Sequence, residues 1–85
     1  MATIIRANGE KEKTEDTSLE NLQKIVGGWI EPISFYDGRT MYVNEDGNIA
    51  GLPVNMAALD VYDFPDDIPC VFGDVVVLNR GEDVT

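Results

Sequence analysis

The feature that most constrains this chain is the stretch of residues 17–31, which has the pattern of a capped helix followed at once by a strand. Thr17 and Glu20 have the spacing of a capping box, in which each side chain accepts a hydrogen bond from a free N–H of the first helical turn. The apolar residues that follow recur at helical spacing: Leu19, Leu22, Ile25 and Val26. Gly27 can take the left-handed conformation that ends a helix, and Gly28 lets the chain turn into an extended segment. The stretch therefore predicts a tight helix-to-strand corner.

Size and charge restrict the class of protein. Eighty-five residues, 44% of them hydrophobic, suit one domain over residues 1–85, and a domain this small has a thin margin of stability that homo-oligomerisation would supplement. Six basic and sixteen acidic residues give a formal net charge of -10, which repels nucleic acid and anionic membranes. No apolar run approaches the roughly 20 residues of a membrane span, and no signal-peptide pattern is present. We expect a cytoplasmic protein with no direct nucleic-acid binding and no membrane contact.

Few residues suggest catalysis or metal binding. The chain has no histidine to activate a nucleophile, so Cys70 is expected to be a buried structural thiol. Asn44, Asp46 and Asn48 superficially resemble a calcium loop, but Gly47 is misplaced for that motif and no glutamate closes a twelve-residue loop. We expect no enzyme activity, no metal site and no cofactor, and a hydrolase or transferase is the least favoured function.

The remaining elements follow from turn signals and alternation. Residues 3–5 favour a first strand, Asn8-Gly9 a turn, and residues 10–16 a solvated loop. Residues 29–36 predict a second strand, which Pro32 places at a sheet edge because proline cannot donate to the ladder.

Asp37-Gly38 is a strong hairpin signal, and residues 40–44 are the expected partner strand. A turn at residues 45–47 and a brief return over residues 48–50 come next. Asn55 is a good cap for a short helix that ends near Tyr62.

The last apolar run predicts the centre of the fold. Residues 75–78 are all apolar, which is typical of a strand covered on both faces, and Gly73 marks a bend or bulge before it. The predicted order is β-α-β-β-α-β, an α+β domain with a mixed or antiparallel sheet and one or two short helices packed on one face. A more barrel-like sheet is the alternative. We divide the chain into a strand and charged loop (1–16), a core (17–79) and a polar tail (80–85).

Four short motifs resemble a known family. They are Leu22-Gln23-x-x-Val26-Gly27-Gly28-x-Ile30-Glu31, Asn44-Glu45-x-Gly47, Gly51-Leu52-Pro53-x-Asn55-x-Ala57 and Gly73-Asp74. In this order they resemble a small phage- and plasmid-borne domain of unknown function, family 3846 of the domains so catalogued, over about residues 17–79. The resemblance implies a gene carried by phages, plasmids or integrated elements, and it supplies no catalytic residues. This chain has Met56 where the family tends to have a basic residue.

Five residues are candidates for a ligand site. Aromatic rings with a few placed polar groups suit a planar ligand, which gives the set Trp29, Tyr36, Arg39, Asn44 and Asn55. Each asparagine can equally be explained as a cap of a turn or helix.

The expected function is that of an anti-defence accessory protein, which binds and sequesters a small host signal such as a cyclic nucleotide. The alternative is an acidic decoy, a nucleic-acid mimic that binds a host protein. The first needs local positive charge, which subunit assembly could supply, and the second is motivated by the net charge of -10.

Overall fold

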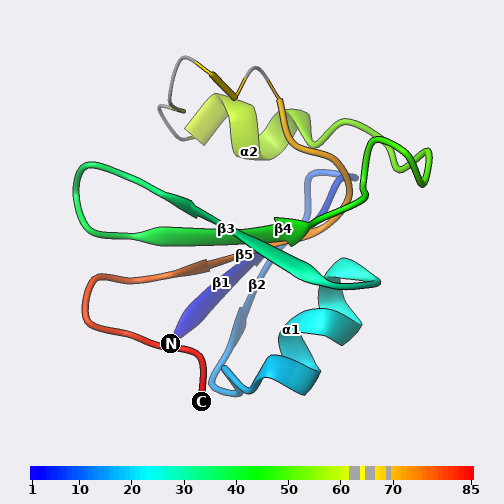
Figure 1. The fold of residues 1–85 in the computed structure, drawn as a ribbon. Coiled ribbons are helices and arrows are strands. Elements are labelled where there is room, and N and C mark those ends of the chain that lie inside the picture. Colours follow the sequence, from blue (N-terminus) through cyan, green and yellow to red (C-terminus); the bar gives the residue numbers. More distant parts are fainter. Residues whose placement is uncertain (62–63, 65–66, 69) are drawn as a thin grey trace.

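One antiparallel sheet forms the body of the protein. The computed structural model describes residues 1–61, 64, 67–68 and 70–85 (Figure 1). The elements run β1 (Ala2–Ile5), β2 (Lys11–Thr14), α1 (Leu19–Val26), β3 (Ile30–Ser34), β4 (Thr40–Asn44), α2 (Met56–Val61) and β5 (Val75–Leu78). The strand order is β2-β1-β5-β4-β3, and every neighbouring pair is antiparallel. The predicted α+β class, with an antiparallel sheet and two short helices, is confirmed.

Strand β5 is the centre of the sheet, as its unbroken apolar run predicted. All four of its residues are buried, and they alternate between two hydrophobic clusters. Val75 and Val77 join the cluster that contains Ala58 of α2, while Val76 and Leu78 join the cluster that contains Leu22 of α1.

The two helices lie on opposite faces of the sheet, so the predicted packing of both on one face is wrong. Figure 1 shows α2 on one side of the strands and α1 on the other. The physical reason is that β5 is apolar on both faces, and each face needs its own cover. The resulting body has three layers.

Helix α1 begins one residue later than the capping box predicted. Ser18, in an extended conformation, is the N-cap, and its hydroxyl accepts the hydrogen bond of the Asn21 N–H at 3.2 Å. Thr17 is 9% exposed, and its backbone carbonyl accepts a hydrogen bond from the Thr85 N–H. Because the C-terminal segment packs against Thr17, the adjacent Ser18 serves as the N-cap.

The end of α1 is the corner that the sequence predicted. Gly27 has a φ of 84°, in the left-handed region, and both it and Gly28 donate to the carbonyl of Gln23. This pair of bonds includes the long bond of a Schellman motif. A Cβ on Gly28 would come within 3.0 Å of the Asn44 amide nitrogen, so the strand β4 end packs directly on the corner.

The segment 10–16, predicted as a loop, contains strand β2, and the prediction is wrong there. The turn at Asn8-Gly9 is a hairpin: the Arg6 N–H donates to Glu10, and the Gly9 N–H donates to Arg6. The strand lies at the edge of the sheet and three of its four residues are exposed, so no apolar alternation marks it. Its pairing with β1 changes the predicted element order to β-β-α-β-β-α-β.

Strand β3 occupies the other edge, as Pro32 indicated. The backbone hydrogen bonds from Phe35 to Arg39 and from Glu45 to Trp29 show that the odd-numbered residues of β3 bond to β4. The backbone nitrogen of Pro32 therefore points away from β4, toward the open edge of the sheet. The missing N–H therefore removes no hydrogen bond between β3 and β4, and it disfavours pairing of another strand at this edge. The strand is shorter than the predicted 29–36, while the turn at Asp37-Gly38 and the partner strand are confirmed.

The connection between β4 and α2 consists of turns. Residues 45–51 form successive turns, so the predicted return strand over 48–50 is wrong. Asn55 caps α2 as predicted; Tyr62, the predicted end, lies outside the described residues.

The polar tail folds back onto the domain. Val84 packs on the α1-side cluster, and the Leu19 N–H lies 3.4 Å from the Thr85 carbonyl. Among the described residues, no helix has the length and apolar character needed to cross a bilayer.

Candidate functional site

Asn55 is a structural hub. It is completely buried, and its amide nitrogen donates to the carbonyls of Ile5 and Gly73, both at 2.9 Å. Its side-chain oxygen accepts from the Ala58 N–H at 3.0 Å. One side chain thus ties β1, the bend before β5 and the start of α2 together, and it has no exposed surface for a ligand.

Asn44 joins the helix corner to the following turn. Its amide nitrogen donates to the Val26 carbonyl at 3.1 Å, and its oxygen accepts from the Asp46 N–H at 2.8 Å. The first bond satisfies one of the free carbonyls at the end of α1. Asn44 remains half-buried, at the edge of the pocket described below.

The Gly73-Asp74 motif also has a clear structural role. Gly73 has a φ of 76°, which confirms the predicted bend, and its N–H donates to the Pro53 carbonyl. The Asp74 carboxylate accepts from the Ala7 N–H at 2.9 Å and from Arg6 at 3.0 Å. Arg6 also bonds Glu12 at 2.7 Å, and these carboxylates, Glu12 foremost, raise the pKa of the guanidinium.

The other three predicted site residues lie at the two ends of the β3–β4 hairpin. Trp29 is 69% exposed beside the open end, whereas Tyr36 is fully exposed in the tight turn. Arg39, after the same turn, forms an ion pair with Asp37 that lowers the pKa of that carboxyl.

The five predicted residues do not line one pocket of a single chain. Strand β3 separates the two ends of the hairpin by about 13 Å at 3.3 Å per residue. Asn55 is enclosed in the interior. The ligand role of these residues stays a prediction, and Asn44 is the member of the set that borders a pocket beside the β3–β4 hairpin.

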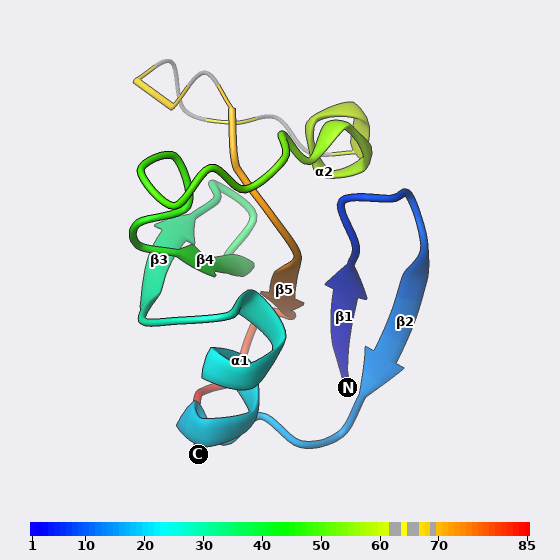
Figure 2. The same ribbon diagram turned by 90° about the vertical axis from the view of Figure 1, so that its right-hand side faces the viewer.

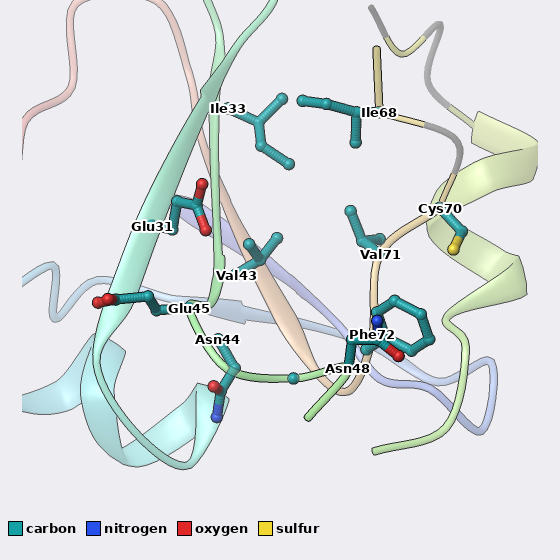
Figure 3. Close-up of a pocket in the computed structure, with 11 residues that line it drawn as sticks. Glu31, Ile33, Val43, Asn44, Glu45, Asn48, Ile68, Cys70, Val71 and Phe72 are labelled. Atoms are coloured by element: carbon teal, nitrogen blue, oxygen red, sulfur yellow. The ribbon is translucent and has the colours of Figure 1, made fainter. Parts of the chain in front are cut away.

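That pocket lies between the β3–β4 hairpin and the segment before β5, and we call it the β3–β4 pocket. Its volume is about 160 Å³. The lining residues come from three separate segments: Glu31, Ile33, Val43, Asn44, Glu45, Gly47, Asn48, Ile68, Cys70, Val71 and Phe72. Figure 3 shows the Glu31 carboxylate on the pocket side of β3, with Ile33, Val43 and Ile68 around the opening, while Glu45 extends away. Cys70 is half-buried, so the prediction of a buried thiol is wrong in that the residue is not fully covered.

A second hollow, the α1 groove, separates helix α1 from the β1–β2 hairpin. Figure 2 shows the hairpin standing beside the helix, which packs over the other strands. The groove has a volume of about 380 Å³ and is lined by Ile4, Arg6, Glu12, Lys13, Thr14, Asn21, Lys24 and Ile25. Arg6 is held there by two carboxylates, and Lys13 donates to Thr3. Lys24 makes no ion pair or hydrogen bond with any described residue.

Residues of three sequence motifs border a third hollow, of about 340 Å³. They are Val26, Gly27, Leu52, Pro53, Gly73 and Asp74, with Ala7 and Ile25 completing the wall. Asp74, the one charged residue in the described lining, already bonds Arg6 and the Ala7 N–H, so the motifs meet mainly to pack the end of α1 against the bend before β5.

Most of the described carboxylates have no cationic partner. Four carboxylates form ion pairs: Glu12, Asp37, Asp74 and Glu82. Ten others in the described part of the chain have no cation within ion-pair distance: Glu10, Glu15, Asp16, Glu20, Glu31, Glu45, Asp46, Asp60, Asp67 and Asp83. Hydrogen bonds from Ser18 lower the pKa of Asp16, and the terminal ammonium lowers that of Glu82. Within the described residues, no group of three or more potential metal ligands is close enough to hold an ion.

Sequence reasoning missed most of the β3–β4 pocket. Its described lining residues come from β3, from the end of β4 with the turn that follows, and from the segment before β5, and only the fold brings these together. The single local signal was the odd-numbered face of β3, where Glu31 interrupts the apolar residues Trp29, Ile33 and Phe35.

The fold and the site define a small, strongly acidic α+β domain with a pocket of mixed apolar and acidic lining beside an edge hairpin. The chain belongs to the family described as Domain of unknown function (DUF3846), whose model matches residues 1–85. No curated protein and no solved structure matches the chain.

Proposed function

We propose that this chain is a non-enzymatic accessory protein of a phage or other mobile element, which acts in the host cytoplasm by occupying the nucleic-acid-binding surface of a host protein. The observation that carries the proposal is that ten carboxylates in the described part of the chain have no cationic partner. Such a surface attracts a basic site and speeds encounter with it, while it repels nucleic acid itself. An anti-defence role follows if the occupied protein belongs to a host defence system.

The pairing of two arginines and the lining of the β3–β4 pocket favour this function over capture of an anionic signal. Arg6 and Arg39 are already engaged by carboxylates, which reduces what either can offer a phosphate. The described lining of the β3–β4 pocket includes two carboxylates and no cation. A basic partner fits both facts.

The test is affinity capture from a bacterial host lysate, at low salt and at about 0.5 M salt. We expect a nucleic-acid-binding protein that is released by high salt and displaced by added DNA or RNA, because exposed charges are screened beyond roughly 10 Å even at 0.1 M. A partner retained at high salt and indifferent to nucleic acid would contradict the proposal.

A cyclic nucleotide or related signal is the second candidate, supported by one observation. The α1 groove places the unpaired Lys24 near Thr14 and Asn21 in a hollow of about 380 Å³, within the size range of small-molecule pockets. A homo-oligomer could add further cations to it.

Calorimetric titration of a nucleotide panel tests this candidate, with Lys24→Gln as the variant and Lys11→Gln as the control. Binding that Lys24→Gln alone weakens supports the groove; no heat with any nucleotide removes the candidate.

A further inference from the structure

The β3–β4 pocket has the size, walls and charge to receive a single basic side chain. We infer that it takes one arginine side chain of the partner, as the anchor of the complex; this inference rests on the proposed function and gives it a specific site. The argument proceeds from volume, to walls, to charge.

The volume suits a side chain and not a nucleotide. At about 160 Å³ the pocket is close to the roughly 150 Å³ cavity that accepts a benzene molecule, and well below the roughly 300 Å³ at which small-molecule pockets begin. An arginine side chain beyond its β-carbon is of that smaller size.

The walls suit an aliphatic stem with a flat polar end. Ile33, Val43 and Ile68 line the pocket with aliphatic side chains, and Phe72 also lines it, with its ring drawn away from the Glu31 carboxylate in Figure 3. Long basic side chains bury their methylene groups on apolar surface and keep the charged end near polar groups. A guanidinium also sheds water more easily than an ammonium does.

The charge is complementary to a cation. The Glu31 side chain has no hydrogen bond or ion pair with any described residue, and its carboxylate lies on the pocket side of β3 (Figure 3). Among the described residues, no lysine or arginine lines the pocket. A guanidinium there can bond the carboxylate with two parallel N–H groups, a geometry that lysine lacks.

The experiment titrates the chain with three blocked tripeptides, Gly-Arg-Gly, Gly-Lys-Gly and Gly-citrulline-Gly, and follows backbone amide shifts by NMR. The proposal expects shifts centred on residues 31–33, 43–48 and 70–72, with binding strongest for arginine and weakest for neutral citrulline. Shifts spread evenly over the acidic surface, or equal binding of citrulline, would overturn it.

Glu31→Gln and Glu20→Gln form the matched pair of variants, since both residues are exposed and each change removes one negative charge. We expect Glu31→Gln to weaken the arginine peptide roughly two- to fivefold, the range of an exposed ion pair, and Glu20→Gln to leave it unchanged. Equal weakening by both variants indicates unspecific attraction and refutes the pocket.

The two proposals fail in different ways. If the arginine peptide binds as expected but no host protein is captured, the pocket stands and the proposed function falls. If capture succeeds and Glu31→Gln captures as much partner as the wild type does, the function stands and the arginine anchor falls.

Discussion

Replacing Asn55 by aspartate should strongly destabilise this domain, although the two side chains have almost the same shape. An aspartate keeps the oxygen that accepts from Ala58 and is as good an N-cap as asparagine. It loses the two N–H donors and points an oxygen at the carbonyls of Ile5 and Gly73, each 2.9 Å from the present nitrogen. The substitution therefore separates the capping role from the donor role.

The magnitude follows from the burial. Each of the two carbonyls left without its donor costs about 1–3 kcal/mol, so the donors alone account for roughly 2–6 kcal/mol. Burial of an unpaired charge adds to that sum or forces the carboxyl to stay protonated. The whole domain is expected to have roughly 4–13 kcal/mol of stability, from about 0.05–0.15 kcal/mol per residue. Asn55→Ala, which loses the cap as well as the donors, should be similarly severe.

Urea unfolding followed by far-ultraviolet circular dichroism measures the effect, because Trp29 is 69% exposed and its fluorescence is expected to change little on unfolding. We expect a loss of at least 2 kcal/mol for Asn55→Asp, on the order of the donor contribution. If Asn55→Asp falls within about 0.5 kcal/mol of the wild type, the range of an ordinary surface substitution, the hub role assigned to Asn55 is wrong.

Three smaller effects complete the predictions. Gly73→Ala should cost about 1–2 kcal/mol for the positive φ of 76°, and more if the Leu52 methyl 2.8 Å from the new Cβ cannot move; urea midpoints check this. Ser18→Ala should cost about 1 kcal/mol by the same assay as the loss of an N-cap. Since Arg39 lowers the pKa of Asp37 in the folded state, ionised Asp37 stabilises the fold above its ordinary pKa of about 3.9, and this stability is lost as the pH falls through the lower folded pKa. The Tm difference between wild type and Asp37→Asn should therefore disappear at low pH, and a difference that persists there would show that charge is not its cause.

Much of the fold was predictable where a local pattern has a local cause. The apolar run of β5 predicted a central strand, Pro32 an edge strand, and Gly27 a left-handed helix end, and each was confirmed. These features depend on backbone conformations or on burial that a few neighbouring residues specify.

The failures share a different cause. Strand β2 is polar because its outer edge and most of its side chains are exposed to water, so the residues Lys11–Thr14 look like a loop. The only sequence signal for the strand is the hairpin turn that precedes it. The β1–β2 and β3–β4 hairpins have the same type of loop. In each, a side chain, Asn8 or Asp37, accepts a hydrogen bond from the N–H two residues later, that of Glu10 or Arg39. Recognition of Asp37 as a hairpin signal could have been extended to Asn8.

The candidate site was the least predictable part. The two asparagines were chosen because polar groups at element ends can bind ligands. The amide N–H groups of Asn55, however, are hydrogen-bonded to backbone carbonyls of β1 and of the bend before β5. The pocket that remains open takes its walls from three distant segments, and one of them, around Ile68 and Cys70, had no sequence signal.

The order of apolar, glycine and turn residues was enough to determine an acidic α+β domain built on a helix-to-strand corner, because those residues act through their own backbone torsions and their neighbours. Tertiary structure alone decided that the helices cover opposite faces, which asparagine is buried, and which carboxylate faces a pocket. Those outcomes depend on contacts between segments that lie far apart in the chain, and such contacts leave no periodic trace in any one of them.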